Sequence, residues 1–133
     1  IVQRIPKQAW TLADDYLTNQ TERFLISEII REKVLQNTRK ELPYSTAVQM
    51  EVFDESRRQE GFIHVAAAVI VERPGQKKIV IGRGGRMIKK IGSAARKELL
   101  GFLGISKMYL ELHVKVVPEW RNQQRLLDSF GVR

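Results

Sequence analysis

Three glycines fall within four consecutive positions of this sequence, in the segment Gly82-Arg83-Gly84-Gly85. Glycine adopts positive φ angles freely and has no side chain to keep a ligand at a distance, so a glycine-rich backbone can approach a phosphate closely. The segment runs into a helix that is predicted to begin at Arg86, and the start of a helix presents backbone N–H groups and the positive end of its dipole. These features predict a site for phosphate groups.

Basic residues concentrate around this loop. The chain has 133 residues, with 23 Lys and Arg against 15 Asp and Glu, a net charge of +8. Positions 73–97 hold nine of the basic residues and no acid, which leaves 14 basic and 15 acidic residues elsewhere. The nine are Arg73, Lys77, Lys78, Arg83, Arg86, Lys89, Lys90, Arg96 and Lys97. A neutral body with one positive segment favours a polyanion site, although a solvated basic helix face would carry the same charges.

The sequence does not indicate a nucleotide-binding loop, a local metal site or an acid–base catalytic pair. A dinucleotide-binding loop would need glycine where Met87 stands, and no Gly-Lys-Ser/Thr sequence for a nucleotide triphosphate occurs in the chain. There is no cysteine, and His64 and His113 are too far apart for a local metal motif. Carboxylates do not cluster among the basic residues, so no acid–base pair is indicated. The sequence therefore favours binding over catalysis.

Hydrophobic periodicity predicts an α+β domain. In chain order the expected elements are a helix at 21–38, strands at 48–53 and 62–72, one or two helical turns at 76–81, a helix from 86 that Gly104 ends, a strand at 107–116 and a short terminal helix after Pro118. The segment 1–18 has no clear period and is interpreted as a lead-in. Three consecutive alanines at 66–68 leave room for close packing, which we expect a helix to fill.

The glycine loop and the order of elements resemble a known family. The string from Val80 to Ile88 is similar to the KH signature, an apolar pair followed by GxxG, two further residues and Ile. The order helix, strand, strand, short helix, loop, helix, strand resembles the type II KH arrangement. Three stretches, LTNQTERFLISEIIREKVLQNTRKELPYSTAV, IGRGGRMIKKIGSAARKELLGFLG and YLELHVKVVPEWR, resemble the C-terminal part of the Era GTPases over nearly all of 17–131.

This resemblance implies a fold and a ligand. The fold would be a type II KH domain, with a three-stranded mixed sheet on about three helices and a short C-terminal helix. Residues 1–18 would be a linker from a missing GTPase domain, and 19–133 the KH domain. The ligand would be single-stranded RNA, near the 3′ end of small-subunit ribosomal RNA during ribosome assembly. The RNA-binding residues would be Lys77, Lys78, Ile81, Gly82, Arg83, Gly84, Gly85, Arg86, Met87, Lys89 and Lys90.

Bases would lie against an apolar groove next to the loop. Ile81, Met87, Ile88 and Ile91 could form part of it, although Ile88 and Ile91 fit the domain core better. A competing hypothesis is a KH-fold module that binds protein instead of RNA. Such modules usually lose the glycines or the basic residue between them, and both are present here.

The resemblance also implies partners and a location. The partners would be the small ribosomal subunit and the protein's own N-terminal GTPase domain, which would hold GTP and Mg. The chain itself would need no cofactor and catalyse no reaction. It would be cytoplasmic, with peripheral association at the inner face of the cell membrane.

Overall fold

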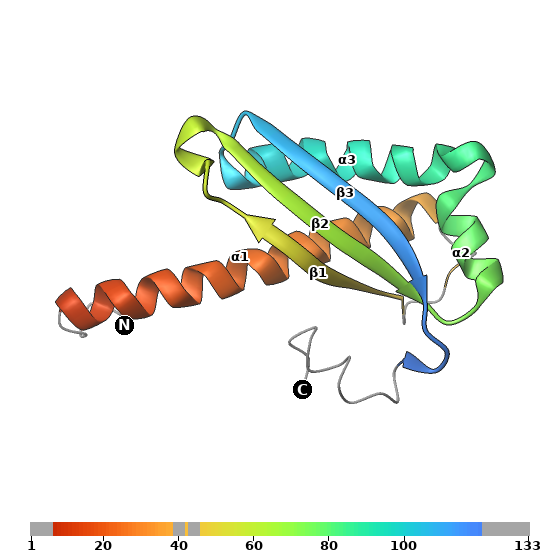
Figure 1. Ribbon diagram of the computed structural model, residues 1–133, viewed down its shortest axis with the longest axis horizontal. Coiled ribbons are helices and arrows are strands. Elements are labelled where there is room, and N and C mark those ends of the chain that lie inside the picture. Colours follow the sequence, from red (N-terminus) through yellow and green to blue (C-terminus); the bar gives the residue numbers. More distant parts are fainter. Residues whose placement is uncertain (1–6, 39–41, 43–45, 121–133) are drawn as a thin grey trace.

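The structure is a computed structural model that describes residues 7–38, 42 and 46–120, with side chains from residue 21 onward (Figure 1). The elements are α1 (Lys7–Thr38), β1 (Ala47–Asp54), β2 (Phe62–Val71), α2 (Pro74–Ile81), α3 (Arg86–Leu103) and β3 (Lys107–Val116). Single 3-10 turns occur at Arg58–Glu60 and Arg83–Gly85. The predicted α+β class and the predicted order of elements are confirmed.

The three strands form one mixed sheet in the order β1-β2-β3. β1 and β2 pair antiparallel through the connection at 55–61, and β3 pairs parallel to β2. A parallel neighbour needs a crossover, which α2 and α3 supply. The glycine loop therefore lies at the corner where α2 turns into α3, beyond one end of the sheet (Figure 1).

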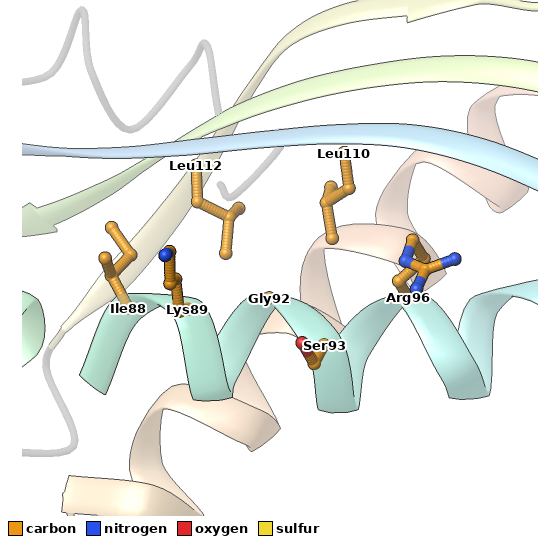
Figure 2. Close-up of a pocket in the computed structure, with 7 residues that line it drawn as sticks. All are labelled: Ile88, Lys89, Gly92, Ser93, Arg96, Leu110 and Leu112. Atoms are coloured by element: carbon orange, nitrogen blue, oxygen red, sulfur yellow. The ribbon is translucent and has the colours of Figure 1, made fainter. Parts of the chain in front are cut away.

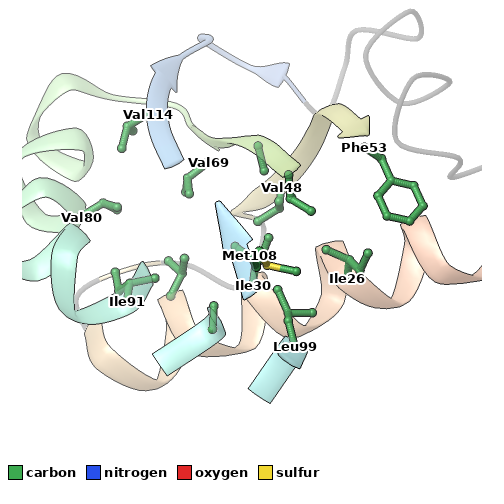
Figure 3. Close-up of a cluster of buried hydrophobic side chains, with 14 of the residues drawn as sticks. Ile26, Ile30, Val48, Phe53, Val69, Val80, Ile91, Leu99, Met108 and Val114 are labelled. Carbon is green, nitrogen blue, oxygen red and sulfur yellow. The ribbon is translucent and has the colours of Figure 1, made fainter. Parts of the chain in front are cut away.

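The core fills the space between the sheet and the two long helices (Figure 3). Ile26 and Ile30 of α1 and Ile91 and Leu99 of α3 are fully buried there, as is Val69 of β2. Each such side chain contributes roughly 1.5–3 kcal/mol relative to an exposed position. On α3, Ile91, Ala95 and Leu99 form one buried stripe, and along β3 inward and outward side chains alternate. Together these two patterns fix how α3 lies across the sheet.

The sheet face opposite α1 and α3 is here called the outer sheet face. Ala67 points to the other side, into the core with the helices, as expected for close helix packing, whereas Ala66 and Ala68 point to the outer sheet face, where Ala68 packs against Trp120. Trp120 is buried in this contact and anchors the segment after β3 onto the sheet. The small alanines also let Glu51 of β1 reach across β2 to Lys115 of β3, at 2.8 Å between Oε2 and Nζ.

Two expectations about the ends of the chain need comment. α1 begins at Lys7, so the prediction that the helix starts near Thr21 is wrong. Residues 7–20 continue the helix past the edge of the sheet (Figure 1). Asn19 and Glu22 have the spacing of a capping box, which usually marks the start of a helix, but here they lie inside α1. The terminal helix predicted after Pro118 falls beyond residue 120, outside the described residues.

Candidate nucleic-acid interface

Gly82 ends α2 and turns the chain into the loop. Its φ and ψ are 75° and 176°, a region that only glycine adopts readily. A Cβ at this position would lie 2.6 Å from Cβ and 2.8 Å from the backbone N of Met87, the second residue of α3. Position 82 therefore requires glycine, both for its backbone angles and for the close approach of α3.

The rest of the loop is a single tight turn open to solvent. The Gly85 N–H donates to the Gly82 carbonyl at 3.2 Å, and the Arg86 N–H donates to the Arg83 carbonyl. Gly84 and Gly85 have positive φ angles of 61° and 77°. No heavy atom lies within 4 Å of a Cβ placed on either. A ligand can therefore approach this backbone without meeting other protein atoms.

Some of the N–H groups that were predicted to bind a phosphate form hydrogen bonds within the turn instead. Those of Gly82, Gly85 and Arg86 already donate to carbonyls of α2 and the loop. In the described chain, the amides of Arg83 and Gly84 are the loop donors that remain for a ligand. A phosphate at this site would therefore find fewer free N–H donors than the start of a helix usually offers.

α2 holds the first half of the loop in place. The Gln76 side-chain oxygen accepts hydrogen bonds from the N–H groups of Glu72 and Arg73, at 2.9 and 3.1 Å, which fixes the start of the helix. Val80 is fully buried in the core at its other end. The short helix is therefore anchored on one side, while Lys77 and Lys78 remain exposed on the other.

A groove of about 290 Å³ runs between α3 and β3, beginning one turn after the loop (Figure 2). Its lining residues are Ile88, Lys89, Gly92, Ser93 and Arg96 of α3, and Leu110 and Leu112 of β3. Leu110 and Leu112 point from the strand toward the helix, where Gly92 offers no side chain (Figure 2). A Cβ at Gly92 would already be 3.8 Å from Leu112 Cδ1, so glycine keeps this part of the groove wide.

The groove differs in part from the residues proposed for it. Ile88 lines it, although the core interpretation was preferred, whereas Ile91 is fully buried in the core. Ile81 and Met87 are half-buried and pack against the core cluster. Five of the lining residues are absent from the set predicted from the sequence: Gly92, Ser93, Arg96, Leu110 and Leu112. A glycine inside a helix followed by serine was the available signal, because it marks close approach to that helix.

The predicted RNA-binding residues divide between three places. Arg83, Gly84 and Arg86 are exposed at the loop, and Lys77 and Lys78 are exposed on α2. Lys89 lies on the flank of α3 that lines the groove. Lys90 is its exposed neighbour on the same helix. The fold therefore gathers these residues around one corner.

The cations of this corner have no acidic partners in the part of the chain that the structure describes. All nine basic residues from Arg73 to Lys97 are exposed, and none takes part in an ion pair within the described residues. By contrast, Arg58 lies 2.8 Å from both Glu22 and Glu55. Like charges held together repel one another, and an anionic ligand relieves that repulsion.

Both histidines lie on the outer sheet face beside carboxylates. His64 Nε2 is 2.9 Å from Glu111, its ring packs 5.0 Å from that of Tyr109, and the Tyr109 hydroxyl also donates to Glu111. Hydrogen bonds from His64 and Tyr109 lower the pKa of Glu111. His113 pairs with Glu51. The described residues contain no group of three potential metal ligands.

Among the described helices, none has the length and apolar character needed to cross a bilayer.

Comparison with known proteins places these features in a family. A KH domain family model matches residues 41–121, which include the sheet, the loop and the groove. The chain is 46% identical over 127 residues to the GTPase Era of Geobacter metallireducens, and 50% identical over 117 residues to that of Leuconostoc citreum. These matches cover 96% and 88% of this chain but 42% and 38% of the relatives, so the chain spans about two fifths of their length.

Solved structures agree with the sequence relatives. The crystal structure of Aquifex aeolicus Era bound to GDP and AlF4⁻ matches with a TM-score of 0.74 and 40% identity, over 82% of this chain and 36% of that one. A structure of Era in complex with MgGDPNP and nucleotides 1506–1542 of 16S ribosomal RNA matches with the same values. The resemblance to the KH domain of the Era GTPases is confirmed.

Proposed function

Since the chain belongs to the KH domain family, we propose that it binds single-stranded RNA at the corner formed by the glycine loop and the α3–β3 groove. The observation that carries the proposal is the set of nine exposed cations, none of which has an ion-pair partner among the described residues, around a loop whose backbone is open to solvent. KH domains use a GXXG loop to clamp about four nucleotides of backbone.

Each part of the corner has its own task in binding. The free amides of Arg83 and Gly84 donate to a phosphate, and the surrounding Lys and Arg side chains add attraction that carries little sequence information. Bases lie in the groove, against the side chains of Ile88, Leu110 and Leu112. Because these walls are aliphatic, they hold a base by contact area instead of aromatic stacking. Lys89 and Arg96 at the rim provide polar hydrogens to the base edges or the backbone.

The target we propose is the 3′ end region of small-subunit ribosomal RNA during ribosome assembly. The support is the relative solved with nucleotides 1506–1542 of 16S ribosomal RNA, which is 40% identical to this chain. The partners would be the small ribosomal subunit and a GTPase domain of the same protein. That domain would bind GTP and Mg and perform the hydrolysis for which the longer relatives are named. This chain, without a Gly-Lys-Ser/Thr loop, would act by binding alone.

A protein-binding KH module without RNA is the weaker alternative. A surface that had exchanged RNA for protein would not need Gly84 open to solvent, or nine cations without carboxylate partners in the described part of the chain. A phosphate ligand accounts for both features.

The location proposed is the cytoplasm, with peripheral association at the inner face of the cell membrane. Its support is the exposed basic corner, since anionic headgroups attract clusters of Lys and Arg near a bilayer. Co-sedimentation with anionic vesicles, compared with neutral vesicles, tests it. Equal recovery with both kinds of vesicle would contradict it.

The loop is tested by replacing Arg83 and Gly84 together with Asp. Two carboxylates there repel the RNA backbone, and their side chains fill the space that a phosphate would occupy. We expect the double variant to lose RNA binding in a titration with single-stranded RNA while its thermal unfolding stays cooperative. Lys107→Asp, at an exposed lysine at the start of β3, is the control and should keep binding. An unchanged dissociation constant in the double variant would show that the loop is not the site.

The kind of RNA is tested with a duplex of the same sequence. Paired and stacked bases cannot enter the groove, so the single strand should bind more tightly. Neutralising about four phosphates predicts a log–log salt slope of roughly −3 for the single strand. Equal or tighter binding of the duplex would indicate a general basic surface and refute the groove as the site for bases.

A further inference from the structure

α3 borders a second hollow on the flank turned away from the groove. It has a volume of about 690 Å³. Its lining residues are Lys33 of α1 and Ala94, Lys97, Glu98, Gly101 and Phe102 of α3. None of these residues lines the groove between α3 and β3. The two hollows therefore lie on opposite sides of one helix.

The side chains of this hollow suit a nucleotide. Phe102 is 43% exposed, so part of its ring is open to a ligand. Lys97 is exposed and takes part in no ion pair among the described residues, whereas the charge of Glu98 is balanced by Lys33 at 2.6 Å. Proteins that bind single-stranded nucleic acid combine aromatic rings for the bases with cations along the backbone.

The floor of the hollow is built from small residues. Ala94 and Gly101 lie seven positions apart, which places them on one side of the helix two turns from each other. No heavy atom lies within 4 Å of a Cβ placed on Gly101, apart from its chain neighbours, so the space in front of Gly101 is open. A planar group could enter beside the ring without moving the backbone.

A ridge of cations connects the two hollows. Lys89 and Arg96 line the groove, and their neighbours in sequence are Lys90 and Lys97, of which Lys97 lines the second hollow. All four are exposed, and none has an acidic partner in the described part of the chain. The pairs are seven residues apart, about 10 Å along the helix axis. A phosphodiester backbone crossing α3 would meet positive charge along the way.

We propose that this hollow is a second contact for the same RNA strand. A nucleotide that flanks those held in the groove places its base against Phe102 and its phosphate near Lys97. The inference rests on the proposed function, because the strand must first be held by the loop. The occupant is RNA because the charge of Lys90 and Lys97 continues that of the loop, and the one acid of the hollow is already neutralised by Lys33.

The test compares oligonucleotides of two lengths. A strand of about four nucleotides fills the groove, and one of about twelve also reaches the second hollow. Three variants address the hollow: Phe102→Ala removes the ring, Lys97→Gln removes the charge, and Gly101→Leu fills the space. The leucine meets no protein atoms at its Cβ and has a higher helix propensity than glycine, so the fold should be preserved.

For Phe102→Ala we expect about tenfold weaker binding of the longer strand, the effect of losing one stacked base, and no change for the shorter. Gly101→Leu should act likewise, and Lys97→Gln should reduce the salt slope of the longer strand by about 0.7. Tyr109→Ala, at a ring 54% exposed on the outer sheet face, and Lys107→Gln are the matched controls and should bind both strands as the parent does.

The outcomes separate this inference from the function on which it rests. Equal losses on both strands would place the effect in the groove and overturn the second contact. The second contact would also be overturned if all three variants bound both strands as tightly as the parent does. The hollow would then be a candidate site for a protein partner. Failure of the parent chain to bind either strand would refute the proposed function itself.

Discussion

The loop corner and the outer sheet face both carry exposed basic side chains, but only those on the outer sheet face lie next to carboxylates. On the outer sheet face, Lys115 and His113 both pair with Glu51, and His64 pairs with Glu111. At the loop corner, cations such as Arg83 and Lys78 have no carboxylate partners in the described structure. One surface is neutralised within the chain, and the other leaves its charge available to a ligand.

This difference teaches where to look for binding in a basic protein. A net charge of +8 does not identify a site, because paired and unpaired cations contribute equally to it. Exposed ion pairs add little stability, about 0–1 kcal/mol each. The main effect of the pairs on the outer sheet face is therefore to reduce the attraction of that face for anionic ligands. The unpaired set at the corner provides the long-range attraction for a polyanion.

The largest expected effect is at Gly82, on which the shape of the corner depends. Gly82→Ala forces a Cβ into the backbone of Met87 and into a glycine-only region of φ and ψ, so the free energy of unfolding should fall by about 3 kcal/mol. Gly85→Ala meets no atoms and should cost only about 1–2 kcal/mol, from its positive φ. Urea denaturation measures both. Equal losses would mean that contact with α3 does not constrain the loop.

A smaller effect tests the contrast between paired and unpaired cations. Lys77→Gln combined with Lys78→Gln removes two unpaired charges next to the loop, so the log–log salt slope for single-stranded RNA should become shallower by about 1.4. Lys115→Gln removes a charge that Glu51 already balances and should leave the slope unchanged. Titrations at several salt concentrations decide. A similar change from Lys115→Gln would show that the outer sheet face also attracts RNA.

The smallest effect concerns the acid stability of the outer sheet face. Burial raises the pKa of Glu51, but hydrogen bonds from Lys115 and His113 outweigh it and lower the pKa below the ordinary 4.5. Because the folded-state pKa is lowered, the stability contributed by Glu51 is fully present above pH 4.5 and is lost as the pH falls through the folded-state pKa.

Glu51→Gln should therefore lower the free energy of unfolding by up to about 1 kcal/mol at pH 7 and make no difference in strong acid. Thermal unfolding of parent and variant at a series of pH values measures this. RNA affinity at pH 7 should be the same for both. A stability difference that persists at low pH would mean that Glu51 acts through packing and not through its charge.

Much of the fold could be predicted because its signals are local. Alternation identified β3, the Ile91, Ala95 and Leu99 stripe identified the buried side of α3, and the glycines located the loop. The start of α1 was missed because Asn19 and Glu22 have the spacing of a capping box inside a continuous helix. Residues before Thr21 show no apolar period, so nothing local indicated that the helix continues back to Lys7.

The groove could be predicted only in part because it forms between distant segments. Ile88 was visible next to the glycine loop, but Leu110 and Leu112 could be recognised only as apolar positions of a strand, with no local sign of the helix that they meet. Only the parallel pairing of β3 with β2 brings them over Gly92. The second hollow likewise depends on Lys33 of α1 meeting Glu98 of α3, a contact between residues 65 positions apart that no local pattern encodes.

The irregularity in β1 has a further consequence. The pairing with β2 shifts between Met50 and Val52, so Glu51 occupies a bulge on the first strand of the sheet. A strand at the border of a sheet can recruit a strand from another molecule, and bulges and charged side chains discourage this because they interrupt the ladder of hydrogen bonds. A charged residue at this bulge therefore discourages a strand of another molecule from pairing with β1, even at high protein concentration.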